Sequence, residues 1–114
     1  MSDDQPSGRD WAVLDRLIAI IEARRDANPR DSHTARLLAK GRVKIAQKLG
    51  EEALETALAS VAEGADDVIG ESADLLFHWL VLMADMGIDP QQVLARLVER
   101  EGLSGVAEKA ARGE

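Results

Sequence analysis

Two pairs of acidic side chains have a spacing that suits metal-assisted chemistry. Glu52 and Glu55 are three residues apart, and so are Glu71 and Asp74. In a helix this spacing puts both carboxylates of a pair on one face, about 60° apart. Four carboxylates that meet across two packed helices repel one another unless a divalent cation neutralises them, and hard oxygen ligands suit Mg²⁺ or Mn²⁺. For a single Glu-x-x-Glu pair, a solvated helix face is the commoner alternative.

A basic stretch directly precedes these acids. Lys40, Lys44 and Lys48 recur every four residues, and we expect them on one helical line. The sequence has neither the Gly-x-x-x-x-Gly-Lys nor the Gly-x-Gly-x-x-Gly loop that cradles phosphates. A bound nucleotide would therefore depend on a metal and on side chains such as these lysines. A solvated basic face is the alternative.

Helices must position all of these groups. Alanine and leucine lead the composition, and no useful run alternates between apolar and polar residues. We expect helices over 10–27, 34–40, 42–63, from 66–67 to 87, and over 90–100, and a weak helix or a frayed end over 101–114. The breaks come from Asn28-Pro29, Gly41, Gly64 and Gly87. Asp89-Pro90 supplies an N-cap and a first helical residue.

The fourth helix is unusually apolar, because only one position of the segment 75–83 is not apolar. We expect it to be buried almost all round, with Glu71, Asp74, His78 and Asp85 in a narrow stripe that faces a cleft or a partner helix. His78 is then either a packed core histidine or a partner of an acid. On the third helix, Glu52 and Glu55 are expected beside the main apolar face, which is formed by Ala46, Ala53, Ala57 and Val61.

Length and composition limit the class of protein. The chain of 114 residues predicts a flexible segment over 1–9 and a single domain over 10–114. A net charge of −7 disfavours nucleic-acid binding, and the lack of cysteine excludes disulfides and zinc–thiolate sites. No apolar run is long enough to span a membrane. The acidic, polar start lacks the features of a signal peptide, so a cytoplasmic location fits.

Three strings of residues then point to a known family. Residues 32–41 (SHTARLLAKG), 47–55 (QKLGEEALE) and 71–83 (ESADLLFHWLVLM) closely resemble the phosphoribosyl-ATP pyrophosphohydrolase family. The resemblance covers roughly residues 11–100. It also places the chain in the wider all-α NTP pyrophosphohydrolase (MazG-like) superfamily, whose pattern is Glu-x-x-Glu followed by Glu-x-x-Asp.

The resemblance implies roles for particular residues. It assigns Mg²⁺ binding, with Mn²⁺ as a second candidate, to Glu52, Glu55, Glu71 and Asp74. Glu51 or Glu55 would orient or deprotonate the attacking water. Lys40 and Lys48 match basic positions near the substrate phosphates, and Ser32 and Thr34 match a Ser-Tyr-Thr element of many relatives. Lys44 is added as a predicted phosphate-binding residue because it belongs to the same basic stretch. His33 stands where many relatives have a tyrosine.

The implied reaction is the second step of L-histidine biosynthesis. Water would split 1-(5-phospho-β-D-ribosyl)-ATP between its α and β phosphates, giving phosphoribosyl-AMP and pyrophosphate. The family is typically dimeric, so we expect an all-α helical-bundle subunit that completes its core by forming a homodimer. Two alternatives remain at this point: a housecleaning NTP pyrophosphohydrolase of the same superfamily, and a non-catalytic helical dimerisation module.

Overall fold

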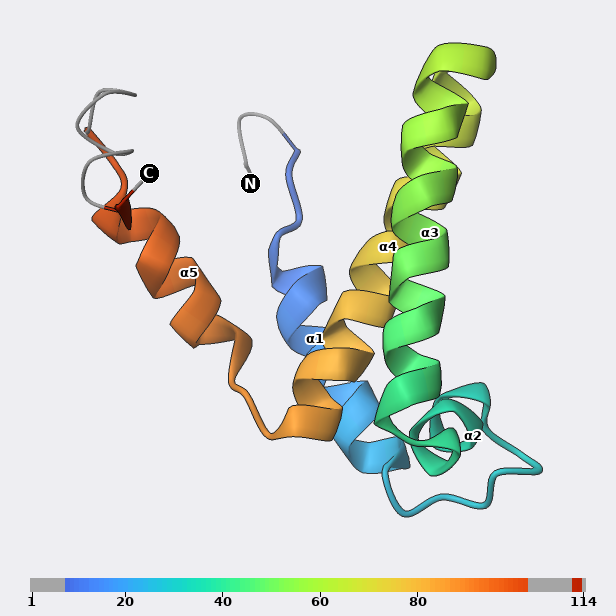
Figure 1. Cartoon of the computed structure of the whole chain (residues 1–114). Helices are drawn as coiled ribbons and strands as arrows, with labels where there is room; N and C mark the ends of the chain where they lie inside the picture. The colour runs from blue at the N-terminus through green and yellow to red at the C-terminus, as the bar shows by residue number, and fades with distance from the viewer. Residues whose placement is uncertain (1–7, 103–111, 114) are drawn as a thin grey trace.

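The computed structural model describes residues 8–102 and 112–113, and the regular elements within these ranges are all helices. The five helices, drawn in Figure 1, are α1 (Ala12–Arg24), α2 (His33–Lys40), α3 (Arg42–Ala62), α4 (Ala65–Met86) and α5 (Pro90–Glu99). The predicted all-α fold with five helices is confirmed. Most of the predicted flexible segment 1–9 and most of the tail 101–114 lie outside the described residues. Within the described ranges, no helix is both long and apolar enough to cross a membrane.

The helix boundaries follow the predicted breaks, apart from α1. We expected the first helix over 10–27, but it covers only Ala12–Arg24. Past Arg24 the chain changes to tighter bonds between residues three apart, because Ala27 N–H donates to the Arg24 carbonyl at 3.0 Å. Pro29 then prevents the helix from continuing. The end of α1 is therefore a turn that leads the chain towards α2.

The two longest helices, α3 and α4, form an antiparallel hairpin. Figure 1 shows them side by side along most of their length, joined by the short link through Gly64. Asp66 and Asp67 lie in the first turn of α4, where their negative charges stabilise the helix by interacting with the positive end of its dipole. This hairpin brings the two acidic pairs of the sequence onto neighbouring helices.

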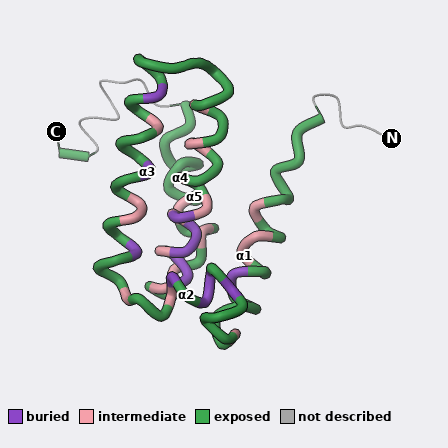
Figure 2. The backbone as a smooth tube through the Cα atoms, turned by 90° about the vertical axis from the view of Figure 1, so that its right-hand side faces the viewer, coloured by how far each residue is buried: buried purple, intermediate pink, exposed green. Residues whose placement is uncertain are grey.

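A small aliphatic core fixes one end of the hairpin. Its buried members come from α1, α2, α3 and α4, and they are Ile21, Leu37, Ile45, Leu80, Val81 and Ala84. Figure 2 shows buried segments of these four helices at the end of the hairpin where α2 lies. Burying each large aliphatic side chain contributes roughly 1.5–3 kcal/mol. The core therefore sets how α3 lies against α4, and with it the position of the acids further along.

The buried face of α3 differs from the predicted one. We expected Ala46, Ala53, Ala57 and Val61 to form it, but all four are exposed. The buried residues are Ile45, Glu52 and Ala59. They are spaced seven residues apart, which is close to two helical turns, so they form one line facing α4. The prediction that Glu52 lies beside the apolar face was wrong, because Glu52 lies in the helix interface itself.

The second half of α4 is buried, but the helix is not covered all round within one chain. Its buried residues are His78, Leu80, Val81, Met83 and Ala84. Ile69, Leu76 and Met86 are exposed. The expectation of nearly complete burial is therefore not met by the single chain. These apolar side chains stay uncovered by the rest of the described chain.

Candidate active site

Three glutamates meet between α3 and the first half of α4. Glu52, Glu55 and Glu71 each offer a carboxylate oxygen, and these oxygens lie within 4.8 Å of one another. Glu52 and Glu55 lie one turn apart on α3, and Glu71 reaches them from α4. Glu52 is buried, Glu71 is half-buried and Glu55 is exposed. We call these three residues the acid cluster.

The surroundings of the acid cluster disfavour its negative charge. Burial raises the pKa of Glu52, and the charges of Glu55 and Asp74 raise it further. The pKa of Glu71 is also raised, first by loss of solvent and then by the charge and the hydrogen bond of Glu55. Carboxylates arranged in this way hold either protons or a cation.

The acid cluster fits a divalent metal by two observations. Its oxygens are hard donors at a mutual distance suited to sharing one ion. In addition, Glu52 Oε2 is buried and has no hydrogen-bond partner among the described residues. A buried carboxylate oxygen without a partner is costly, and a bound cation removes that cost. The residues present could therefore hold a metal.

The fourth predicted ligand, Asp74, lies next to the acid cluster without joining the group of three. Its side chain is exposed, and its charge acts on both Glu52 and Glu71. Its backbone carbonyl accepts a hydrogen bond from His78 Nδ1 at 2.7 Å. Asp85, which shares the predicted stripe, lies elsewhere, since Arg42 Nε donates to its Oδ2 at 2.8 Å. The stripe thus divides into a part beside the acid cluster and an ion-paired end.

Glu51 lies one turn before Glu55 on α3, outside the group of three whose oxygens meet. It accepts a hydrogen bond from Gln47 Nε2 at 2.9 Å, and Lys48 Nζ lies 3.5 Å from its Oε1. The Gln47 bond is the main cause of its lowered pKa, and the charges of Lys48 and Lys44 add to it. Glu51 is therefore an ionised carboxylate beside the basic residues, adjacent in sequence to Glu52.

The predicted line of three lysines is wrong in one respect. Lys40 ends α2, and Gly41, with φ of 94°, separates α2 from α3. Only Lys44 and Lys48 share a helical face. Lys40 and Lys48 still lie near one residue, His33. Burial is the main cause of the lowered pKa of His33, and the charges of both lysines, with other nearby charges, lower it further. The turn at Gly41 thus brings lysines of two helices towards the start of α2.

The hydroxyl residues at the start of α2 are both buried. Ser32 is the N-cap, and its Oγ accepts a hydrogen bond from Ala35 N–H at 3.1 Å. Thr34 lies in the first turn of the same helix. The local role of Ser32 is therefore to begin α2, as Ser residues commonly do.

An aromatic contact that sequence reasoning missed joins α2 to α4. The His33 ring stacks on Phe77 with centroids 6.4 Å apart, and Phe77 meets His78 edge-on at 5.3 Å. The signal available in the sequence was the histidine at position 33, in the element that resembles the family. The contact links the basic residues near α2 to the α4 turn that follows Asp74.

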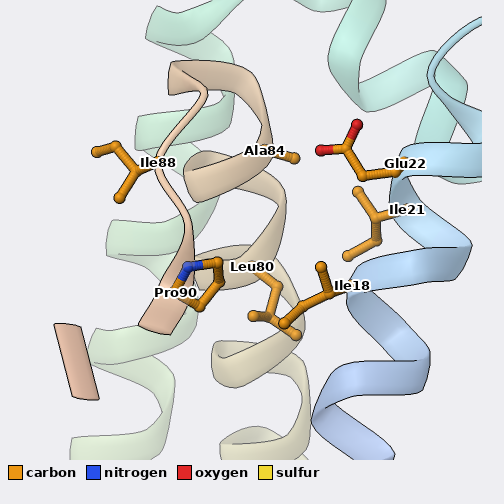
Figure 3. A pocket seen from close by; sticks show the side chains of 7 residues that line it. All are labelled: Ile18, Ile21, Glu22, Leu80, Ala84, Ile88 and Pro90. Carbon is orange, nitrogen blue, oxygen red and sulfur yellow. The ribbon is translucent and has the colours of Figure 1, made fainter. Parts of the chain in front are cut away.

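A separate pocket lies on the other side of α4. Figure 3 shows its lining, which comes from α1, α4, the link after α4 and the start of α5: Ile18, Ile21, Glu22, Leu80, Ala84, Ile88 and Pro90. Glu22 is its one acidic residue, and Arg25 pairs with it at 3.0 Å. This pocket lacks the grouped carboxylates of the acid cluster. The candidate active site is therefore the region between α3, α4 and the start of α2.

Comparison with known proteins shows the family of the chain. The sequence profile of the phosphoribosyl-ATP pyrophosphohydrolase family matches residues 14–101. The phosphoribosyl-ATP pyrophosphatase of Parvibaculum lavamentivorans is 57% identical over 92% of this chain and 96% of its own. The protein of that name from Azospirillum brasilense is 50% identical over 98% of this chain and 98% of its own. The one from Rhizorhabdus wittichii is 58% identical over 88% of this chain and 94% of its own. The chain belongs to the phosphoribosyl-ATP pyrophosphohydrolase family.

Proposed function

We propose that this protein is a metal-dependent phosphoribosyl-ATP pyrophosphohydrolase. It would hydrolyse 1-(5-phospho-β-D-ribosyl)-ATP to phosphoribosyl-AMP and pyrophosphate, the second step of L-histidine biosynthesis. The observation that carries the proposal is the acid cluster, which combines grouped carboxylates with an unpartnered buried oxygen in a chain of this family. The catalytic unit is a single domain over residues 10–114.

Under this proposal, Mg²⁺ or Mn²⁺ is held by Glu52, Glu55 and Glu71, with Asp74 completing the ligand set. The metal, when bound, neutralises phosphate charge and polarises the attacked phosphorus and a water molecule. The raised pKa values of Glu52 and Glu71 support this assignment, because a cation relieves the same repulsion that raises them.

The other side chains would handle the water and the phosphates. Glu55 is the exposed member of the acid cluster, so it can orient or deprotonate the water, and Glu51 is the alternative base. Lys40, Lys44 and Lys48 would stabilise charge on the leaving pyrophosphate. Ser32 and Thr34 would contribute near the phosphates through the start of α2, where Ser32 already caps the helix.

The proposal includes a homodimer located in the cytoplasm. Support for the dimer comes from α5, whose apolar side chains Leu97 and Val98 are 55% and 62% exposed in the single chain. Figure 1 shows most of α5 standing apart from the α3–α4 hairpin. An amphipathic helix exposed in this way gains stability when a second subunit covers it. The cytoplasmic location follows from the substrate, a highly charged nucleotide that does not cross membranes unaided.

Phosphorus NMR tests the proposed reaction directly. The purified protein is incubated with Mg²⁺ and phosphoribosyl-ATP, beside a panel of ordinary and damaged nucleoside triphosphates and an EDTA control. We expect pyrophosphate chiefly from phosphoribosyl-ATP, and only with metal. Pyrophosphate from the panel alone would reassign the protein to housecleaning pyrophosphohydrolases. No release from any substrate would favour a non-catalytic helical module.

A further inference from the structure

A histidine that the proposed function does not use lies beside the acid cluster. His78 is 7% exposed, and its Nε2 is buried without a hydrogen-bond partner among the described residues. The only other buried side-chain nitrogen or oxygen in that condition in the described part of the chain is Glu52 Oε2. Native proteins seldom leave buried polar atoms unpaired, so two such atoms in one region require an explanation.

The orientation of the His78 ring places it towards the acid cluster. Nδ1 bonds the Asp74 carbonyl one turn back, so the ring leans towards the part of α4 that carries Glu71 and Asp74. Seven residues separate Glu71 from His78, which puts both on the same face of α4. Glu71 in turn offers a carboxylate oxygen within 4.8 Å of one from Glu52. The ring thus lies on the face of α4 that meets Glu52.

The chemistry of the two unpaired atoms defines what can join them. A carbonyl oxygen only accepts, so Nδ1 is the donor in the bond to Asp74, and Nε2 of the neutral ring is left as an acceptor. Glu52 Oε2 is an acceptor as well. Two acceptors are satisfied together by one group with two donors, and water is the smallest such group.

We propose that His78 is a positioning residue, which holds the Glu52 carboxylate through a shared water molecule and so orients that carboxylate for the metal. The inference rests on the proposed function, since it concerns the same metal site. Nδ1 anchors the ring to the turn that carries Asp74, and Nε2 is the buried atom left to bind the water. One ring would then keep a ligand of each helix in place, as polar partners behind metal ligands commonly do.

Two substitutions of His78 distinguish the roles of its two ring nitrogens. His78→Asn keeps a donor near the position of Nδ1 and removes the group at Nε2. His78→Gln does the reverse, because its longer amide reaches the position of Nε2. Asp85→Asn is the matched control, since it removes a charge further along the same helix, in the ion pair with Arg42. Mn²⁺ affinity is measured for the wild type and each variant by electron paramagnetic resonance of free Mn²⁺, together with thermal unfolding without metal.

We expect His78→Asn to weaken Mn²⁺ binding about 10- to 100-fold, and we expect His78→Gln and Asp85→Asn to stay within about threefold of the wild type. Equal weakening by Asn and Gln at position 78, or wild-type affinity in His78→Asn, would overturn the inference. Absence of Mn²⁺ binding by the wild type would overturn it too. A wild type that binds Mn²⁺ but leaves phosphoribosyl-ATP intact would refute only the proposed function.

Discussion

At the scale of single residues, Glu52 shows a conflict between folding stability and metal binding. It lies at 8% exposure between Ile45 and Ala59, on the face of α3 that packs against α4. An apolar residue there would suit the metal-free fold better, because it would carry no charge into the interface. The carboxylate is retained at a cost to stability that a bound cation would offset.

We expect Glu52→Gln to separate stability from function. The substitution removes the buried charge but keeps the shape, so the metal-free protein at neutral pH should melt at the wild-type temperature or above it. The stabilisation by Mg²⁺ should be lost, and kcat/KM for phosphoribosyl-ATP should fall by about 10²-fold or more, as expected when a metal ligand is removed. Differential scanning fluorimetry with and without Mg²⁺, and a pyrophosphate-release assay, measure the two effects.

Glu63→Gln is the matched control for that substitution, because Glu63 is exposed just past the end of α3. It should keep both the Mg²⁺ shift and the activity. If Glu52→Gln retained the full thermal shift with Mg²⁺, the metal would bind elsewhere and the assignment of the acid cluster would fail.

The raised pKa values of Glu52 and Glu71 predict how the metal-free protein responds to pH. An unperturbed glutamate has a pKa of 4.5 here, and both groups titrate above it in the folded state. The folded state therefore binds more protons than the unfolded chain in this window, and stability is lost as pH rises through the folded pKa values. Two lowered pKa values have the opposite effect: that of Glu51 changes stability below pH 4.5, and that of His33 changes it below pH 6.5.

Thermal melts of EDTA-treated protein between about pH 4.5 and about pH 7.5 test the predicted direction of this pH dependence. Because His33 is common to both proteins, the comparison of the wild type with Glu71→Gln isolates the glutamate. Relative to Glu71→Gln, the wild type should lose melting temperature as pH rises through the window, and Mg²⁺ should reverse that loss at the upper end. The same pH dependence in both metal-free proteins would contradict the raised pKa of Glu71.

At the scale of helices, two glycines illustrate opposite uses of the same residue. Gly41 joins α2 to α3 with φ of 94°, in a region that residues with a Cβ atom avoid. Gly50 is exposed within α3, and no other group lies within 4 Å of an added Cβ atom. Backbone conformation therefore decides whether a change to alanine raises or lowers the free energy of unfolding, since no neighbouring group obstructs an added Cβ atom at either site.

We expect Gly41→Ala to destabilise the protein by about 1–2 kcal/mol and Gly50→Ala to stabilise it by about 0.5–1 kcal/mol. Urea denaturation of the two variants measures both. The pair controls for the chemical change, because each adds one methyl group. Destabilisation of similar size at both sites would show that something other than φ decides the cost, such as a partner subunit packed against α3.

The helices themselves were largely predictable, and their contacts were not. Gly41, Gly64 and the Asp89-Pro90 cap act locally, so the sequence places the limits of α2 to α5 well. The burial of Glu52 depends on which line of α3 meets α4, and the short alanines competing for that face gave a misleading apolar pattern. The contact of His33 with Phe77 joins residues far apart in the chain and leaves no periodic signal.

The acid cluster was predictable only in part for the same reason. The spacing within each pair follows from helix geometry, and the short link at Gly64 makes the hairpin. Which three of the four carboxylates come within ligand distance depends on the packing of Ile45, Leu80 and the rest of the core. Single-residue spacing therefore identified the candidates, and tertiary packing selected among them.

At the scale of the whole molecule, the single chain is more open than its length requires. Its radius of gyration is 16.9 Å, whereas a compact chain of this length has roughly 13 Å. Large apolar side chains are exposed on several helices, including Trp11 at the start of α1 and Leu76 on α4, which line one shallow pocket. The core described above is small for a domain of this size, and the proposed homodimer would add further burial.

The face of α5 formed by Leu94, Leu97 and Val98 is where that association can be tested. We expect Leu97→Glu to convert a dimer into a monomer and to lower the melting temperature, because it places a charge in the centre of an apolar contact. Gln92→Glu is the control, since it adds the same charge on the opposite side of α5 and should leave the dimer intact. Light scattering coupled to gel filtration gives the mass of each. If the Leu97→Glu variant were still a dimer, the subunit contact would have to be formed by the exposed residues of α3 and α4. The exposed apolar face of α5 would then need another explanation.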